Sequence, residues 1–253
     1  MILFRNLSLE EHLKKMHLPW VLFMTWRDLL FASWRVPVEM LRPHVPPAHA
    51  IDTFDGSAWV TMVPMRVTGM HWRGVPPIQG IDTLRELNLR TYTTRNGKPG
   101  VYFLSIECPS VFNDWMAQHC FGVPYYEAQI ATYSDGSSFR FAAERTQKDK
   151  PPAAFFANFS PTGETFSPQP GTLEQFLVER YCLYFVKDRS IYRGDIHHDD
   201  WKLQLAETQI DVNTVPGAAG LDLPAKPDHT VFCIRTDTLI WPPVNEGPIP
   251  AAG

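Results

Sequence analysis

Polar side chains occupy every second position of one segment of the chain: Glu86, Asn88, Arg90 and Tyr92. The positions between them carry Leu87, Leu89 and Thr91. This period of two predicts a strand whose two faces differ in polarity. A solvated outer face would explain the polar row. A pocket would also explain it, with Glu86 as a general acid or base and Arg90 as a ligand-binding residue, because a buried carboxylate and guanidinium can grip a polar ligand.

Two phenols stand together after Pro124, in the segment FGVPYYEA. We expect a strand to begin here, so Tyr125 and Tyr126 point to opposite faces and at most one of them lines a pocket. A phenol hydroxyl can donate to a developing oxyanion, or the ring can simply pack with its hydroxyl satisfied. His119, near the end of the helix predicted over 110–122, is a further candidate for ligand binding.

The segment ERYCLY repeats the combination of acid, arginine and phenol with Glu179, Arg180 and Tyr181. A buried salt-bridge network is the favoured interpretation of this cluster, and ligand binding by Arg180 is the alternative. Arg145, at the end of the strand expected in FRFAAER, is another arginine that we expect at the ligand.

Adjacent histidines in the segment IHHDDW could suggest a metal site. Neighbouring residues of a strand point to opposite faces, so His197 and His198 share one ion only if the strand bulges. A zinc site needs three or four converging ligands, and no HxH or HxxxH spacing supplies the others. We therefore expect no metal and no cofactor. One of the pair, with His197 as the candidate, is expected to face the interior and bind a pocket group.

Composition excludes several classes of function. The formal net charge is −4 and no basic stripe is visible along the sequence, so we expect no nucleic-acid partner. The apolar segment 19–34 is interrupted by Arg27 and Asp28, and charges occupy the N-terminus, so we expect no membrane span and a cytoplasmic protein. No GxSxG, P-loop or GxGxxG motif occurs in the right context. The four cysteines are widely spaced and read as reduced thiols: Cys108, Cys120, Cys182 and Cys233.

The 23 prolines favour many short strands over long helices. Asn96-Gly97 is a strong hairpin signal in the clearest pair of strands. We predict a mainly β, β-rich α+β protein with one mostly antiparallel, barrel-like domain and a few short helices. The expected organisation is a helical segment over 1–18, a single β domain over 19–242 and a flexible tail over 243–253.

Four segments together resemble the YqjF-like family of uncharacterised bacterial proteins: LRELNLRTYTTRNGKPGVYFLSIE, FGVPYYEA, TLEQFLVERYCLYFV and IHHDDWKLQLAE. The resemblance extends in consistent order from about Trp26 to Trp241. That family is similar to a distant branch of the acetoacetate decarboxylase fold. The resemblance implies a single domain of strands rolled into a cone-shaped core around an internal cavity.

The resemblance to acetoacetate decarboxylase places the pocket arginine of that enzyme at Arg27 and its pocket glutamate at Glu86. The two lysines that follow the proline in the enzyme, of which the first forms the Schiff base, correspond to Tyr125 and Tyr126. A phenol cannot form an imine, so Schiff-base decarboxylation does not follow from the fold. The comparison assigns the pocket position to Tyr125. Two lesser departures are from the YqjF-like branch itself: the helix ending AQHC, where an arginine is expected after the alanine, and Ala143, where relatives tend to carry serine.

Two functions remain open at this point. A cavity enzyme, with lyase or hydrolase chemistry that needs no imine, would use Arg27 to hold an anion, Glu86 as acid or base and Tyr125 as an oxyanion donor. A small-molecule binder or sensor would use the same cavity without chemistry. In a third interpretation Arg27 and Glu86 form a structural ion pair and the tyrosines only pack. The sequence leaves a homo-oligomer open.

Overall fold

The computed structural model describes residues 19–77, 83–109 and 122–249 of the chain. The first strands are β1 (Leu22–Val36), β2 (Ala50–Ile51), β3 (Ala58–Trp72), β4 (Leu84–Arg95) and β5 (Lys98–Cys108). The later strands are β6 (Tyr125–Ser134), β7 (Phe139–Arg145), β8 (Ala154–Phe166), β9 (Cys182–Lys187), β10 (Ser190–His198), β11 (Leu203–Asn213), β12 (His229–Ile240) and β13 (Val244–Pro248). The helices are short: α2 (Val38–Leu41), the 3-10 turn η1 (Arg42–His44), α4 (Leu173–Val178) and α5 (Val215–Ala218).

No helix within the described ranges is both long and apolar enough to cross a membrane. The helix predicted in 1–18 lies outside the described residues. So does the helix predicted over 110–122 except for its last residue, and therefore His119.

One sheet contains all of these strands, and it forks at β5 and at β12. The edge of β5 that faces away from β4 pairs first with β9, through Val101 and Tyr102, and then with β6, from Ile106 to Cys108. The edge of β12 that faces away from β1 pairs with β11 around Cys233 and with β10 around Thr238. Each fork lets the same sheet continue in two directions.

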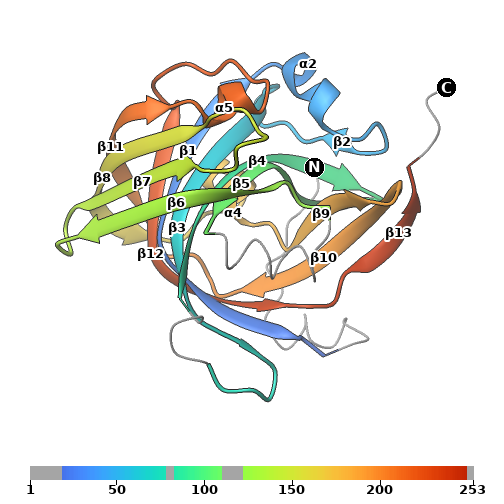
Figure 1. Ribbon diagram of the computed structural model, residues 1–253, viewed down its shortest axis with the longest axis horizontal. Coiled ribbons are helices and arrows are strands. Elements are labelled where there is room, and N and C mark those ends of the chain that lie inside the picture. Colours follow the sequence, from blue (N-terminus) through green and yellow to red (C-terminus); the bar gives the residue numbers. More distant parts are fainter. Residues whose placement is uncertain (1–18, 78–82, 110–121, 250–253) are drawn as a thin grey trace.

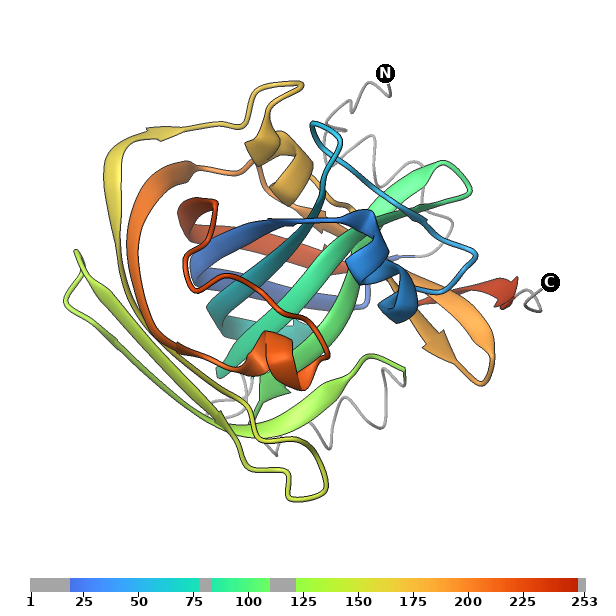
Figure 2. The same cartoon turned by 90° about the horizontal axis from the view of Figure 1, so that it is seen from above.

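The two branches close into two rings of paired strands that share one wall. The first barrel comprises β1, β3, β4, β5, β9, β10 and β12. The second barrel comprises β1, β3, β4, β5, β6, β7, β8, β11 and β12. Figure 1 shows β7, β8 and β11 on one side of the shared strands and β9, β10 and β13 on the other, and Figure 2 shows the same arrangement from above. The predicted mainly β, barrel-like fold is confirmed.

The central part of β4, one of the shared strands, is buried on both faces, so its alternate residues enter different cores. In β4, Leu87 and Leu89 pack with Phe139 and Phe159 in the second barrel. Glu86 and Asn88, which alternate with these leucines in sequence, are buried in the first barrel instead. The period of two in the sequence therefore marks a strand between two interiors, with neither face solvated.

Local signals predicted several elements correctly. Asn96 and Gly97 both have positive φ values, 50° and 74°, and join β4 to β5 in a tight hairpin. The Thr172 side chain caps α4 by accepting a hydrogen bond from the backbone N–H of Gln175 at 3.4 Å.

The C-terminal segment differs from the flexible tail predicted for 243–253. Residues Val244–Pro248 form β13, which pairs with the edge of β10. Glu246 holds this strand in place, because its carboxylate accepts a hydrogen bond from Asn96 and forms ion pairs with Arg95 and Arg193. Prolines are tolerated in an edge strand, so the proline-rich composition of the tail did not exclude pairing.

Candidate functional site

A cavity of about 140 Å³ lies inside the first barrel. Every strand of that ring contributes to its wall. The wall is mostly apolar, and typical contributions are Met24 from β1, Met65 from β3, Phe103 from β5, Leu183 from β9 and Ile240 from β12. We call this space the first-barrel cavity. Its walls suit the apolar body of a small molecule.

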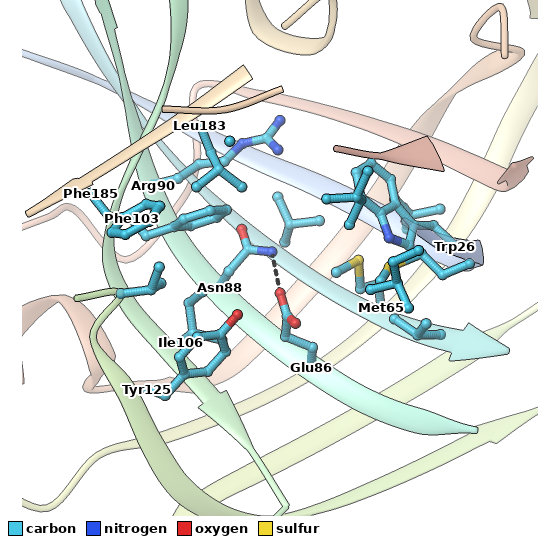
Figure 3. A pocket seen from close by; sticks show the side chains of 18 of the residues that line it. Trp26, Met65, Glu86, Asn88, Arg90, Phe103, Ile106, Tyr125, Leu183 and Phe185 are labelled. Atoms are coloured by element: carbon cyan, nitrogen blue, oxygen red, sulfur yellow. Dashed lines mark hydrogen bonds between the residues drawn. The ribbon is translucent and has the colours of Figure 1, made fainter. Parts of the chain in front are cut away.

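Polar groups are concentrated on one part of the wall, where β4 and the start of β6 meet the cavity. Glu86, Asn88 and Arg90 come from alternate positions of β4, and Tyr125 is the first residue of β6 (Figure 3). The Asn88 side-chain amide donates to Glu86 Oε1 at 3.1 Å. One Nη of Arg90 donates to the carbonyl of Leu177 at 3.1 Å. We call Glu86, Asn88, Arg90 and Tyr125 the polar cluster.

Three polar atoms of cavity-lining residues are buried without a hydrogen-bond partner among the described residues. They are the indole Nε1 of Trp26, the side-chain Oδ1 of Asn88 and Nε of Arg90. A buried donor or acceptor without a partner is costly. Two of these atoms are donors and one is an acceptor, so a ligand that offers two acceptors and one donor would satisfy all three.

Glu86 is the titratable group whose environment is most suited to chemistry. Its side chain is buried, and burial raises the pKa of Glu86 to about 7, against the smaller lowering effects of the Asn88 hydrogen bond and the charge of Arg90. A carboxyl group with a pKa near neutrality can both accept and donate a proton. The structure thus supplies an acid–base group on a cavity wall.

The raised pKa of Glu86 also predicts how stability varies with pH. In the unfolded chain Glu86 loses its proton near pH 4.5, whereas in the folded protein it keeps the proton up to about pH 7. The folded state therefore binds more protons between these values, so the free energy of unfolding falls as pH rises through this window, by up to about 3 kcal/mol. We expect Glu86→Gln to remove this contribution. Denaturant unfolding of both proteins at pH 5 and pH 8 measures it, and equal pH dependence would contradict the assignment.

The two tyrosines after Pro124 are separated by the alternation of β6. Tyr125 lines the first-barrel cavity, and Figure 3 shows its hydroxyl on the side of Asn88 and Glu86. The Tyr126 ring lies 3.8 Å below the guanidinium carbon of Arg145 and is not among the residues that line the cavity. Tyr126 and Arg145 thus pack together outside the lining of the first-barrel cavity.

Arg145 belongs to a buried ion pair. Its Nη2 lies 2.6 Å from Glu107 Oε1, and its Nε donates to the other carboxylate oxygen at 3.1 Å. Ser105 and the carbonyl of Pro151 accept further hydrogen bonds from the same guanidinium. These contacts use four of the five N–H donors of Arg145, and Arg145 is not among the residues that line the cavity, so the geometry favours a structural role over the predicted contact with a ligand.

Arg27 lies on the face of β1 that is turned away from the cavity. Trp26 lines the cavity, so the next residue of the strand points the other way, and Arg27 Nε donates to Thr68 at 3.1 Å. A bulge at Asp28, where φ is 55°, then changes the phase so that Leu29 faces the cavity. The predicted anion contact of Arg27 inside the cavity is not supported by this geometry, and neither is an ion pair of Arg27 with Glu86.

Arg180 and His197 are buried but lie beside the cavity rather than in its lining. Arg180 pairs with Asp52 at 2.5 Å and donates to the carbonyl of Phe176 at 2.9 Å. The His197 ring stacks on Tyr181 with centroids 6.1 Å apart. These contacts fit the interpretation of ERYCLY as part of a buried salt-bridge network. Within the described residues, no group of three or more His, Cys, Asp or Glu side chains is placed to hold a metal ion.

Trp26 and Trp201 line the cavity but were not predicted from the sequence as site residues. Trp26 is two residues after Met24 in β1 and precedes the bulge, so strand alternation places both side chains on the cavity face and could have indicated Trp26. No comparable signal exists for Trp201, which lies between β10 and β11. No lysine is among the described residues that line the cavity, and Lys98 forms an ion pair with Asp195 at 2.5 Å.

The sequence matches one protein family over most of its length. The DUF2071 model, described as "Uncharacterized conserved protein (COG2071)", matches residues 23–237. The chain belongs to the DUF2071 family. This DUF2071 chain is also 38% identical over 223 residues to "Uncharacterized protein YqjF" of Bacillus subtilis (strain 168), covering 88% of the chain and 91% of that protein. The resemblance seen in the sequence is confirmed.

Solved structures similar to the DUF2071 chain share its fold at low identity. An acetoacetate decarboxylase-like enzyme from Sphingomonas wittichii RW1 has a TM-score of 0.61 and 11% identity, covering 91% of this chain and 95% of that one. Acetoacetate decarboxylase from Legionella pneumophila has a TM-score of 0.59 and 9% identity, with coverage of 96% and 98%. The enduracididine biosynthesis enzyme MppR, complexed with pyruvate, has a TM-score of 0.61 and 12% identity, with coverage of 95% for both chains. At such identities the comparison shows a shared fold alone.

Proposed function

We propose that the first-barrel cavity binds a small carbonyl or carboxylate compound whose apolar part lies against the barrel wall. The polar cluster would hold the carbonyl or carboxylate group. The observation that carries this proposal is a buried glutamate with a pKa of about 7 beside Asn88 and Arg90 on an otherwise apolar wall. In the similar structures, MppR is described in complex with pyruvate, which is a small keto acid. That description supports the ligand class proposed for this chain.

The same cluster supports acid–base chemistry without an imine. Glu86 would take a proton from the substrate or an attacking water, and would return it to the leaving group. The Tyr125 hydroxyl would donate to the oxyanion that develops on the substrate carbonyl, and Arg90 would stabilise the same charge. This assignment makes the protein a lyase or hydrolase that acts on a small carbonyl or carboxylate compound.

A non-enzymatic binder or sensor is the second candidate. It is favoured by the mostly apolar wall and by the three buried polar atoms without partners, which a bound molecule would satisfy whether or not it reacts. A panel of 2-oxo acids, 3-oxo acids and lactones separates the two functions. In either case a compound that binds should raise the melting temperature of the wild-type protein. Only an enzyme would also convert that compound to product.

A substitution that fills the cavity tests whether binding takes place there. Leu183→Trp adds an indole to the cavity wall, so we expect the affinity for a compound found in the panel to fall about tenfold or more. Leu205→Trp is the matched control, because Leu205 is 51% exposed on β11. Calorimetric titration measures both affinities. Unchanged affinity in a folded Leu183→Trp variant would place the binding site elsewhere.

A further inference from the structure

Four arginines stand side by side across four neighbouring strands. Arg235 of β12 is opposite Arg27 of β1, Arg27 is opposite Arg66 of β3, and Arg66 is opposite Arg85 of β4. Residues directly opposite in a sheet have side chains on the same face. We call this set the arginine row. The four positions are far apart in sequence, so no basic stripe is visible in the sequence itself.

Within the described part of the chain, carboxylates pair with only two of these arginines. Asp28 lies 2.5 Å from Arg66, and Asp237 lies 2.8 Å from Arg235. Like charges directly opposite each other in a sheet destabilise it, so the row carries a cost that these two acids offset in part. The four guanidinium groups and these two carboxylates have a net charge of +2 as a set, and Asp199 is a further acid that acts electrostatically on Arg235.

Arg27 and Arg85 keep donors available. The hydrogen bonds that they make to described residues use Nε alone, to Thr68 at 3.1 Å and to Thr132 at 3.0 Å. The terminal nitrogens of both guanidinium groups are therefore open to a bound anion. Arg66 is also accessible, with its side chain 36% exposed.

A hollow of about 290 Å³ lies beside two members of the row, Arg66 and Arg85, whereas Arg27 and Arg235 are not among the residues that line it. Its lining includes Asp28 of β1, Arg66 of β3, Arg85 of β4, Thr132 and Tyr133 of β6, and Arg140 of β7. Met65 lines both the hollow and the first-barrel cavity, but the polar groups of the two sites differ, because Arg85 precedes Glu86 and points to the opposite face of β4. The hollow therefore belongs to the mouth of the second barrel.

We propose that this hollow binds the phosphate group of a small molecule. One guanidinium suffices for a carboxylate, whereas several guanidinium groups around one hollow match a tetrahedral anion that carries two charges. The Tyr133 ring, 60% exposed with the Arg140 guanidinium 5.8 Å from its centre, offers a surface for an organic group attached to the phosphate. The ligand is either inorganic phosphate in free form or a phosphate ester.

Asp28 competes with the phosphate for Arg66. Removal of its charge by Asp28→Asn therefore strengthens phosphate binding, and asparagine tolerates the positive φ of 55° at this position. An increase in phosphate affinity distinguishes electrostatic competition from general damage to the fold, which would lower the affinity.

The test is calorimetric titration of the full chain with inorganic phosphate, pyrophosphate and adenosine monophosphate at low ionic strength. We expect binding that Arg66→Gln and Arg85→Gln each weaken about tenfold or more, that Asp28→Asn strengthens, and that added salt weakens. Arg189→Gln, at an exposed arginine in the turn between β9 and β10, is the matched control and is expected to bind as the wild type does.

Stronger binding of adenosine monophosphate than of inorganic phosphate assigns the site to phosphate esters, and equal or weaker binding assigns it to the free anion. Absence of binding of all three probes to the wild type overturns the proposal. Equal loss of binding in Arg189→Gln and in the row variants also overturns it. None of the polar cluster lines the hollow. Glu86→Gln is therefore expected to leave phosphate binding unchanged.

Discussion

Glu86→Gln is expected to reduce kcat/KM for the substrate found among the oxo acids and lactones by roughly 10²–10⁴-fold. Glutamine has the shape of glutamate and can still accept the hydrogen bond from Asn88, so the wall of the cavity is preserved. What disappears is the only described cavity group with a pKa raised to about 7. We therefore expect the loss in kcat, with KM little changed.

The pH profile provides a second readout of the same substitution. In the wild type, the rate should change through about pH 7, where Glu86 titrates in the folded protein. This limb should be absent from the residual activity of Glu86→Gln. Glu144→Gln, at an exposed glutamate of β7, is the control and should keep both the rate and the profile. Equal activity in the wild type and Glu86→Gln would remove Glu86 from the mechanism. Ligand binding without turnover in either protein would favour the sensor.

The local part of the fold could be predicted because it is encoded by neighbouring residues. The alternation around Glu86 defined β4, and Asn96-Gly97 defined the turn that follows it. The closure of two barrels could not be predicted in this way. It depends on the forks at β5 and β12, where strands distant in sequence share one edge. No pattern within a single segment specifies which of two partners an edge will take.

The candidate site also combines features encoded by neighbouring residues with features that depend on distant strands. The polar positions of β4 could be grouped because a strand keeps alternate residues on one face. Arg27 was assigned to the cavity by resemblance, and a single bulge at Asp28 determines which residues of β1 face the interior. The arginine row is the converse case. Each arginine looks isolated in sequence, and only the registers of four strands bring Arg66 and its neighbours together.

Arg145→Met is expected to lower the free energy of unfolding by about 3–5 kcal/mol, because it leaves the Glu107 carboxylate buried without its partner. Both side chains of this ion pair are almost fully buried, at 2% and 1% exposure. Glu107 is opposite Tyr126 in the pairing of β5 with β6, and Arg145 stacks on the same ring. We therefore expect the substitution also to loosen the start of β6, from which Tyr125 enters the cavity.

Denaturant unfolding of Arg145→Met, Glu107→Gln and the double variant measures the coupling of the pair. The double variant should cost less than the sum of the single variants, because neither charge is then left alone in the interior. Asp149→Asn is the matched control. The ion pair of Asp149 with Lys150 is exposed at both ends, and exposed pairs contribute only about 0.2–1 kcal/mol, so its loss should be small. If Arg145→Met instead unfolds like the wild type and loses only affinity for the cavity ligand, Arg145 acts on the ligand as the sequence first indicated. Loss of stability with additive single effects would mean that Glu107 and Arg145 act independently, against the distances between them.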